Sequence, residues 1–429
     1  MKVTKIKGTL DYFGNQLNAY RYIEKIALEC CHANGIKEVM LPAIEVTELF
    51  ARGVGEGSDI VSKEMYTFLD RSNRSITLRP EGTAGVTRWF VENKMYINPG
   101  LSKYCYIGPM YRYERPQAGR YREFRQFGVE VFGTGSAYLD ADIIAFADAF
   151  LKKLGIKNVK VLVNNIGSKV SRENYEKVLV EYFTKNIDQM CSDCKNRLLK
   201  NPLRILDCKV DRETEIMKNA PKIADYLIEE DKNYSKAVIE SLKALDVKYE
   251  EDQKLVRGLD YYTSTVFEFV YDDPNSPING LTLLAGGRYN GLTKELDGPE
   301  MDAIGFATGI ERLILVMNEL GVMPEFEDRA DACVITIGES TKLEGIRLTN
   351  YLRSYGLRCE IDYISNNLKP QFKLSDRINA KHILIIGEDE LVNNQIKVKN
   401  IDLKQEEVIN VENILNIFNI EGEKYAYKK

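Results

Sequence analysis

Residues 108–133 constrain the fold of this chain more than any other stretch, because they predict a long β-hairpin. Residues 104–113 and 124–132 are rich in aromatic and β-branched side chains, a composition that favours strands. Residues 115–120 lie between them and include a proline and a glycine, which break regular structure. The pattern therefore predicts two long strands joined by a polar loop.

The second predicted strand has one polar and one apolar face, because side chains alternate along a strand. Gln126, Gly128 and Glu130 share a face that offers an amide, a gap and a carboxylate. The intervening residues are apolar and can pack on a core. We expect the first face to bind a polar ligand, and Gly128 to leave room for it.

The hairpin is cationic although the chain as a whole is acidic. Residues 112–125 hold five arginines and two glutamates, a net charge of +3, whereas the whole chain carries -5. Arginine suits phosphate because its planar fork donates two parallel hydrogen bonds. The hairpin is therefore a candidate site for a phosphate-bearing anion.

Length and composition indicate a cytoplasmic protein of at least two domains. A single core rarely grows beyond about 250–300 residues, and this chain has 429. The N-terminal residues carry no secretory signal, and no apolar run approaches the length of a membrane span. Eight cysteines in such a chain indicate reduced thiols.

The chain contains only two histidines, His32 and His382, and neither lies in a stretch with functional character. A histidine base or a histidine-bound metal is therefore not expected. Arginines and carboxylates remain, which favours catalysis by charge stabilisation.

Three regions follow from the sequence patterns. Residues 1–325 form the first predicted domain, and residues 169–252 are a charged, helical insertion within it. Residues 324–329 are a polar linker, and residues 329–429 alternate strands with helices, which predicts a small open α/β sheet. The last of these helices is expected at residues 411–418.

Cys191, Cys194 and Cys208 lie close together in the insertion. A structural zinc site usually has four ligands, and these three cysteines have no histidine nearby. We therefore expect free thiols and no bound metal, although metal binding stays an open alternative.

Several polar residues near helix starts allow two interpretations. Glu81 and Thr83 lie where a strand meets a helix, so they either cap the helix or hold a ligand's ammonium group. Glu311 and Arg312 begin an apolar helix, where they either face water or, for Arg312, point into a site. Residues 45–50 are predicted to be helical.

Residues 255–270 read as one strand-like segment in which Arg257 precedes Tyr261 and Tyr262. An arginine before a glycine is usually a solvated loop residue, but these neighbours make a site plausible. Residues 285–291 add paired glycines that let a backbone or ligand approach closely.

These stretches, in this order, resemble the histidyl-tRNA synthetase family of class II aminoacyl-tRNA synthetases. YRYERPQAGRYREFRQFGVEVFG is similar to class II motif 2, GFATGIERLIL to motif 3, and the helix and strand ending at Pro42 to motif 1. LVRGLDYYTSTVFE and AGGRYNGL are similar to the two histidine-specific motifs, and LKPQFKLSDRINAKHILIIGEDE to the anticodon-binding domain.

The resemblance implies an α+β fold with an antiparallel class II sheet, a helical insertion and a C-terminal α/β anticodon-binding domain. It implies a homodimer formed through motif 1. The reaction would join L-histidine and ATP into histidyl-adenylate, releasing pyrophosphate, and then transfer histidine to the 3′ end of tRNA(His). ATP would arrive with Mg²⁺ as a substrate complex.

The resemblance also implies roles for individual residues. Those assigned to ATP are Arg112, Arg120, Arg257 and Arg312, with Arg112 and Arg257 at the reacting phosphate. Those assigned to histidine are Glu81, Thr83, Gln126, Glu130, Tyr261, Tyr262 and Tyr289. The alternative is a non-charging paralogue that serves as regulatory subunit of ATP phosphoribosyltransferase. Such a paralogue would be expected to lack Arg257 and the C-terminal domain.

Overall fold

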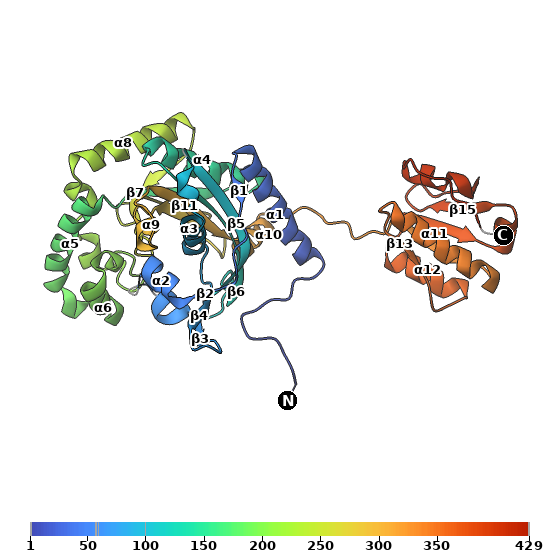
Figure 1. Cartoon of the computed structure of the whole chain (residues 1–429), viewed down its shortest axis with the longest axis horizontal. Coiled ribbons are helices and arrows are strands. Elements are labelled where there is room, and N and C mark those ends of the chain that lie inside the picture. Colours follow the sequence, from blue (N-terminus) through green and yellow to red (C-terminus); the bar gives the residue numbers. More distant parts are fainter. Residues whose placement is uncertain (1, 56–57, 59, 99, 428–429) are drawn as a thin grey trace. The chain divides into compact units, whose positions relative to one another are not determined.

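The computed structural model describes residues 2–55, 58, 60–98 and 100–427, and these form two compact units (Figure 1). The first unit is Met1–Pro324 and the second is Glu325–Lys429. Each unit has its own sheet and its own hydrophobic core.

The first unit is built on an eight-stranded sheet in the order β1-β5-β6-β11-β10-β9-β7-β8. Its strands are β1 (Lys37–Glu38), β5 (Ser102–Tyr111), β6 (Glu123–Phe132), β7 (Val159–Asn165), β8 (Glu250–Glu251), β9 (Thr263–Tyr271), β10 (Thr282–Arg288) and β11 (Ala303–Gly309). The six central strands pair antiparallel, and only the two short edge strands pair parallel to their neighbours. The predicted hairpin is β5–β6, which forms the long antiparallel pair that its composition indicates.

One face of this sheet is the main core of the unit. Phe127, Val129 and Val131 of β6 are fully buried there, as the alternation predicts. The apolar stripes of four helices cover this face: α1 (Asn15–Ala33), α4 (Ala137–Lys153), α8 (Glu229–Ala244) and α10 (Ile310–Glu319). The opposite face carries the polar Gln126 and Glu130 together with a smaller apolar cluster that includes Tyr104, Tyr106 and Phe132.

A three-stranded sheet in the order β2-β4-β3 belongs to the same unit. Its strands are β2 (Ile44–Val46), β3 (Tyr66–Leu69) and β4 (Ser75–Leu78); with it lie α2 (Thr47–Val54), η1 (Ile60–Glu64), α3 (Thr83–Glu92), η2 (Met95–Ile97) and α9 (Leu292–Glu295). The prediction of a helix at residues 45–50 is wrong at its N-terminal end, because the helix begins only at Thr47. Pairing of Glu45 with Thr77 holds that end as a strand, so tertiary contacts override the helical pattern.

The insertion is helical and has a core of its own. Its elements are α5 (Lys169–Thr184), η3 (Ile187–Gln189), α6 (Ser192–Lys200), η4 (Pro202–Ile205), α7 (Glu215–Lys218), η5 (Ile223–Tyr226) and α8. Tyr175, Leu179 and Phe183 of α5 are fully buried at helical spacing in this core.

The second unit is a five-stranded mixed sheet in the order β13-β12-β14-β15-β16. Its elements are β12 (Ala332–Thr336), η6 (Glu339–Thr341), α11 (Lys342–Ser354), β13 (Cys359–Ile361), α12 (Leu368–Arg377), β14 (His382–Ile386), α13 (Glu388–Val392), β15 (Gln395–Asn400), β16 (Gln405–Asn410) and η7 (Val411–Phe418). The helix predicted at residues 411–418 is a 3₁₀-helix. Across the described part of the chain, no helix combines the length and apolarity that a bilayer span requires.

Candidate active site

Several small residues lie on the face of the large sheet that is opposite the main core. Directly paired residues share a face, and the register aligns Gly128 with Ala307 and Glu130 with Gly305. The row continues into β10, where Gly287 pairs with Gly305. A Cβ on Gly305 would lie 1.9 Å from Glu130 Oε2, so that position requires glycine. Of the paired glycines noted in the sequence, Gly287 lies on this face, whereas a Cβ on Gly286 would point into the main core against Phe267 and Phe306.

A cavity of about 910 Å³ opens beside this row, with Ala285, Ala307 and Gly309 of the sheet in its lining, and the insertion supplies part of its wall. All the predicted site residues except two contribute to its lining: Glu81, Thr83, Arg112, Arg120, Gln126, Arg257, Tyr261, Tyr262 and Arg312. The two exceptions, Glu130 and Tyr289, are buried and hydrogen-bond each other. Residues far apart in sequence thus meet in one place.

Glu81 caps the helix that carries Thr83. Its carboxylate accepts hydrogen bonds from the backbone N–H groups of Thr83 (2.6 Å) and Ala84 (2.9 Å). Burial raises the pKa of Glu81, although these two N–H groups and Arg112 oppose that shift. The cap is thus made by Glu81 and not by Thr83, and Glu81 still lines the cavity.

Glu130 is held from both sides by hydroxyl groups. Thr83 donates to its Oε1 at 2.6 Å and Tyr289 donates to its Oε2 at 2.5 Å. Burial raises the pKa of Glu130 to about 8, with Glu81 adding to the shift and the two hydroxyl bonds opposing it. Near neutral pH this pKa keeps the group largely protonated, and a protonated carboxyl adds an O–H donor to its acceptor sites.

Tyr106 fills the space at Gly128, and this corrects the expectation that the glycine leaves room for a ligand. A Cβ on Gly128 would lie 2.3 Å from Tyr106 Cζ, and one on Gly82 would lie 2.2 Å from the same ring. The Tyr106 hydroxyl donates a hydrogen bond to Gln126 Oε1 at 3.2 Å. This hydrogen bond fixes the orientation of the Gln126 side chain, which lines the cavity.

Arg257 enters the cavity from the irregular segment that precedes β9. The strand begins only at Thr263, so the strand-like interpretation of residues 255–262 is wrong. Arg257 Nη1 pairs with Glu268 Oε2 at 2.9 Å. Its Nε is buried and has no hydrogen-bond acceptor among the residues that the structure describes. A buried donor of this kind suits an incoming anion.

Arg112 and Arg120 lie on the hairpin with a shared acidic neighbour. Glu114 is 3.7 Å from Arg112 and 3.5 Å from Arg120. Arg112 also donates through Nε to the Pro80 carbonyl at 2.8 Å, which anchors it beside Glu81. A single carboxylate leaves this pair of guanidinium groups with excess positive charge toward the cavity.

Arg312 lies at the start of α10 and points into the cavity. It donates to the carbonyls of Gly119 (3.2 Å) and Thr282 (2.8 Å), which links helix, hairpin loop and β10. Burial lowers its pKa, and the neighbouring Arg120 and Arg112 lower it further. Like charges gathered this closely favour binding of an anion.

Glu311, the neighbour of Arg312, is buried instead of facing water. It accepts hydrogen bonds from the Tyr12 hydroxyl (2.6 Å) and from the Arg125 backbone N–H (2.8 Å). It therefore ties the N-terminal segment and β6 to α10.

Tyr261 and Tyr262 close the end of the cavity near Glu130, and Tyr289 packs behind them. The ring centroids of Tyr261 and Tyr262 are 4.7 Å apart, and those of Tyr261 and Tyr289 are 5.6 Å apart. Burial raises the pKa of Tyr262 to about 12, so its hydroxyl stays protonated near neutral pH. These rings offer apolar walls with hydroxyl groups at their tips.

Sequence reasoning missed Tyr106, Glu114 and Glu268 as members of the site. Glu268 lies between the buried Phe267 and Phe269 of β9, which is a local signal that it points to the other face, whereas Tyr106 is itself buried and carries no such signal. Their partners, Gln126 and Arg257, follow only from strand register and loop geometry.

An antiparallel sheet with this hairpin, and with arginines and an acidic helix cap that line one cavity on its face, is the catalytic core of a class II aminoacyl-tRNA synthetase. The family model described as histidyl-tRNA synthetase matches residues 8–313, and an anticodon-binding domain model matches residues 331–419. The chain belongs to the histidyl-tRNA synthetase family.

Individual relatives resemble the chain over nearly its whole length. A protein of Bacillus licheniformis named histidine–tRNA ligase is 48% identical, with 92% of this chain and 93% of that protein covered. The crystal structure of apo histidyl-tRNA synthetase from S. aureus has a TM-score of 0.84 at 40% identity, with 98% and 100% covered. A Bacillus halodurans structure described as an ATP phosphoribosyltransferase regulatory subunit/histidyl-tRNA synthetase shares the fold, with a TM-score of 0.63 at 20% identity and 90% and 98% covered.

Proposed function

We propose that this chain is a histidine–tRNA ligase. It activates L-histidine with ATP to form histidyl-adenylate and pyrophosphate, and then transfers the histidyl group to the 3′ end of tRNA(His). The observation that carries this proposal is the cavity that gathers four arginines with Glu81 and Gln126 beside a row of small residues. The histidyl-tRNA synthetase model matches the part of the chain that builds it.

The arginines are assigned to the phosphates of ATP. In-line attack by the histidine carboxylate spreads negative charge over the oxygens of the α-phosphate, and preorganised cations stabilise that charge. Arg112 and Arg257 would hold this phosphate, since both are anchored by hydrogen bonds and line the cavity. Arg120 and Arg312 would hold the outer phosphates, and Mg²⁺ would arrive bound to ATP as part of the substrate.

The acidic and aromatic residues are assigned to histidine. Glu81 and Thr83 would bind the ammonium group, because the Glu81 carboxylate keeps lone pairs free beyond its two cap bonds. Gln126 would place the carboxylate end, with Tyr106 holding its amide. An imidazole donates at one nitrogen and accepts at the other, which suits Glu130 on one side and the Tyr262 hydroxyl on the other.

Tyr261 and Tyr289 would line the walls around the imidazole. A site that hydrogen-bonds both ring nitrogens can reject an analogue that lacks them by about 10⁴–10⁵-fold. Selection of histidine would therefore follow from the pocket alone.

The two ends of the tRNA are assigned to different parts of the chain. Residues 115–120 of the hairpin loop would contact the acceptor end beside the ATP site. The second unit would contact the anticodon, since the anticodon-binding model matches residues 331–419. Binding should weaken as salt rises, because cations that contact phosphates displace counterions.

The chain is further proposed to be cytoplasmic and to form a homodimer through the motif 1 region. Apolar side chains next to Pro42 support the dimer. Met40 is 86% exposed, Ile44 51% and Val46 54%, a cluster that a second copy would cover.

The alternative is a regulatory subunit of ATP phosphoribosyltransferase that does not charge tRNA. Arg257 is present in this chain and is paired within the cavity, and the anticodon-binding model matches the second unit. Both features favour the ligase.

Histidine-dependent exchange of labelled pyrophosphate into ATP tests the first step, and charging of bulk tRNA with labelled histidine tests the second. We expect exchange with histidine and not with other amino acids. Absence of both activities in folded protein would favour the regulatory alternative, and exchange without charging would reject the second step.

A further inference from the structure

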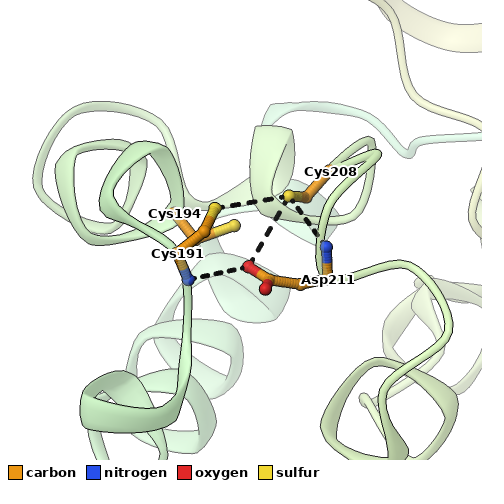
Figure 2. A group of neighbouring side chains, drawn as sticks. All are labelled: Cys191, Cys194, Cys208 and Asp211. Atoms are coloured by element: carbon orange, nitrogen blue, oxygen red, sulfur yellow. Dashed lines mark hydrogen bonds between the residues drawn. The ribbon is translucent and has the colours of Figure 1, made fainter.

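Four potential metal ligands converge in the helical insertion, outside the candidate active site's chemistry (Figure 2). Cys191 and Cys194 come from the start of α6, and Cys208 and Asp211 come from the loop after η4. One ligand atom from each, three sulfurs and a carboxylate oxygen, lies within 4.8 Å of all the others. Cysteines and histidines alone give three ligands in this stretch of the sequence. Asp211 supplies the fourth.

Two of the separations between these atoms match those around one tetrahedral ion. Zinc–sulfur bonds of about 2.3 Å and zinc–oxygen bonds of about 2.0 Å at tetrahedral angles give about 3.8 Å between sulfurs and about 3.5 Å between sulfur and oxygen. Cys191 Sγ and Cys208 Sγ are 3.6 Å apart, and Cys208 Sγ and Asp211 Oδ2 are also 3.6 Å apart. A disulfide needs about 2.05 Å, so these sulfurs are not bonded.

Backbone N–H groups already orient two of the ligands. The N–H of Asp211 donates to Cys208 Sγ at 3.4 Å, and the N–H of Cys191 donates to Asp211 Oδ2 at 3.1 Å. Such outer bonds stabilise thiolates and fix ligand orientation in metal sites. Cys194, Cys208 and Asp211 are buried, so the position between them is shielded from water.

We propose that Cys191, Cys194, Cys208 and Asp211 bind one zinc(II) ion as a structural site with three thiolates and one carboxylate. Soft sulfur ligands in a closed tetrahedral set select zinc over magnesium or calcium. An iron–sulfur cluster spreads its cysteines around several metal atoms, which these short separations do not accommodate. Free thiols that donate to the Asp211 carboxylate are the competing explanation.

The bound zinc ion would stabilise one wall of the candidate active-site cavity. Cys208 itself lines that cavity, together with Leu206, Asp207, Lys209 and Arg212 of the same loop. A metal ion joining this loop to α6 would therefore hold the insertion's edge of the substrate cavity in place.

Metal analysis of the purified full-length chain tests the proposal. After passage over a chelating resin, we expect about one zinc per chain by mass spectrometry, released when a mercurial reagent titrates the thiols. C208S and D211A should each lose most of that zinc. C30S, which changes a half-buried cysteine outside the cluster, should retain it.

A second measurement covers the case in which a ligand variant fails to fold. Cobalt(II) added to wild-type protein after removal of zinc should give the strong visible absorption of a tetrahedral thiolate site, and zinc should abolish it. Limited proteolysis near residues 192–212 should accelerate on removal of the metal and slow again when zinc returns. Metal-free protein that takes up neither ion and titrates as eight free thiols would overturn the proposal, as would zinc that C208S retains.

Discussion

At the scale of single residues, the candidate site depends on buried polar groups that hold each other in place. Glu130 is the centre of one such set, since Thr83 and Tyr289 each donate a hydrogen bond to it. Arg257 is the centre of another, with one nitrogen paired to Glu268 and another buried without an acceptor among the described residues. These two residues therefore lead to the most direct tests.

Arg257→Ala should lower histidine-dependent pyrophosphate exchange by about 10²–10³-fold or more, because it removes a preorganised donor to the reacting phosphate. The circular dichroism spectrum should stay that of wild type. R71A, which changes an exposed residue in the turn between β3 and β4, is the matched control. Near-normal exchange in the Arg257 variant would remove this residue from the mechanism.

Glu130→Gln should change how stability depends on pH in the absence of substrates. Because the pKa of Glu130 is raised to about 8 in the folded state, the folded protein keeps a proton that the unfolded chain releases above its ordinary pKa. Wild-type stability should therefore fall as pH rises from about 5 to 8. The amide does not ionise, so the variant should gain stability relative to wild type over that interval.

Melting temperatures at pH 6 and pH 9 measure this effect, with Glu38→Gln at an exposed position as control. Parallel pH profiles for wild type and the Glu130 variant would contradict the raised pKa.

At the scale of elements, a buried ion pair joins the sheet to its helical cover. Arg288 at the end of β10 lies 2.6 Å from Asp140 of α4, and both side chains are almost fully buried. Arg288 also donates to the Tyr234 hydroxyl of α8 at 2.6 Å and to the Thr134 carbonyl at 2.9 Å. The arginine of the AGGR stretch is therefore a structural link between elements.

Arg288→Met should destabilise the first unit by about 3–5 kcal/mol, because it leaves the Asp140 carboxylate buried without its partner. The double variant Arg288→Met/Asp140→Leu should be less destabilised than Arg288→Met alone, since no charge remains to be buried. Thermal unfolding of the three proteins measures the difference. Equal losses in the single and double variants would show that packing and not charge sets the cost.

At the scale of the whole molecule, the oligomeric state can be tested by one measurement of mass. Met40, Ile44 and Val46 place apolar area on the surface of the first unit. We expect light scattering to give a mass near twice 49.0 kDa. Met40→Asp with Ile44→Asp should shift the mass toward that of one chain, because two carboxylates would be desolvated in the interface.

Leu199→Asp serves as the matched control, since Leu199 is an exposed apolar residue of the insertion. A wild-type protein that runs as a monomer at micromolar concentration would contradict the proposed dimer.

Local sequence was sufficient to predict the elements that build the site. The alternation at Phe127 and Val129 predicted which side chains of β6 pack in the main apolar core, because a strand's side-chain period is two. The other face of β6 is also buried, under side chains from distant segments such as Tyr106 and Tyr289. The short strands β3 and β4 also follow from local sequence, because the polar turn at residues 70–74 separates two runs with aromatic or β-branched residues. The helical pattern at Glu45 failed because cross-strand pairing decided that backbone.

The elements, the side chains of β6 that join the main core and the family motifs thus follow from local sequence. The partners of the site residues depend on the folded chain, since Tyr289 reaches Glu130 across 159 positions and Thr83 reaches it across 47. The tertiary structure also placed Tyr106 against Gly128 and Asp211 beside three cysteines. Periodicity acts between neighbours in the chain, whereas hydrogen bonds and metal ligands depend on which distant segments the folded core brings within a few ångströms.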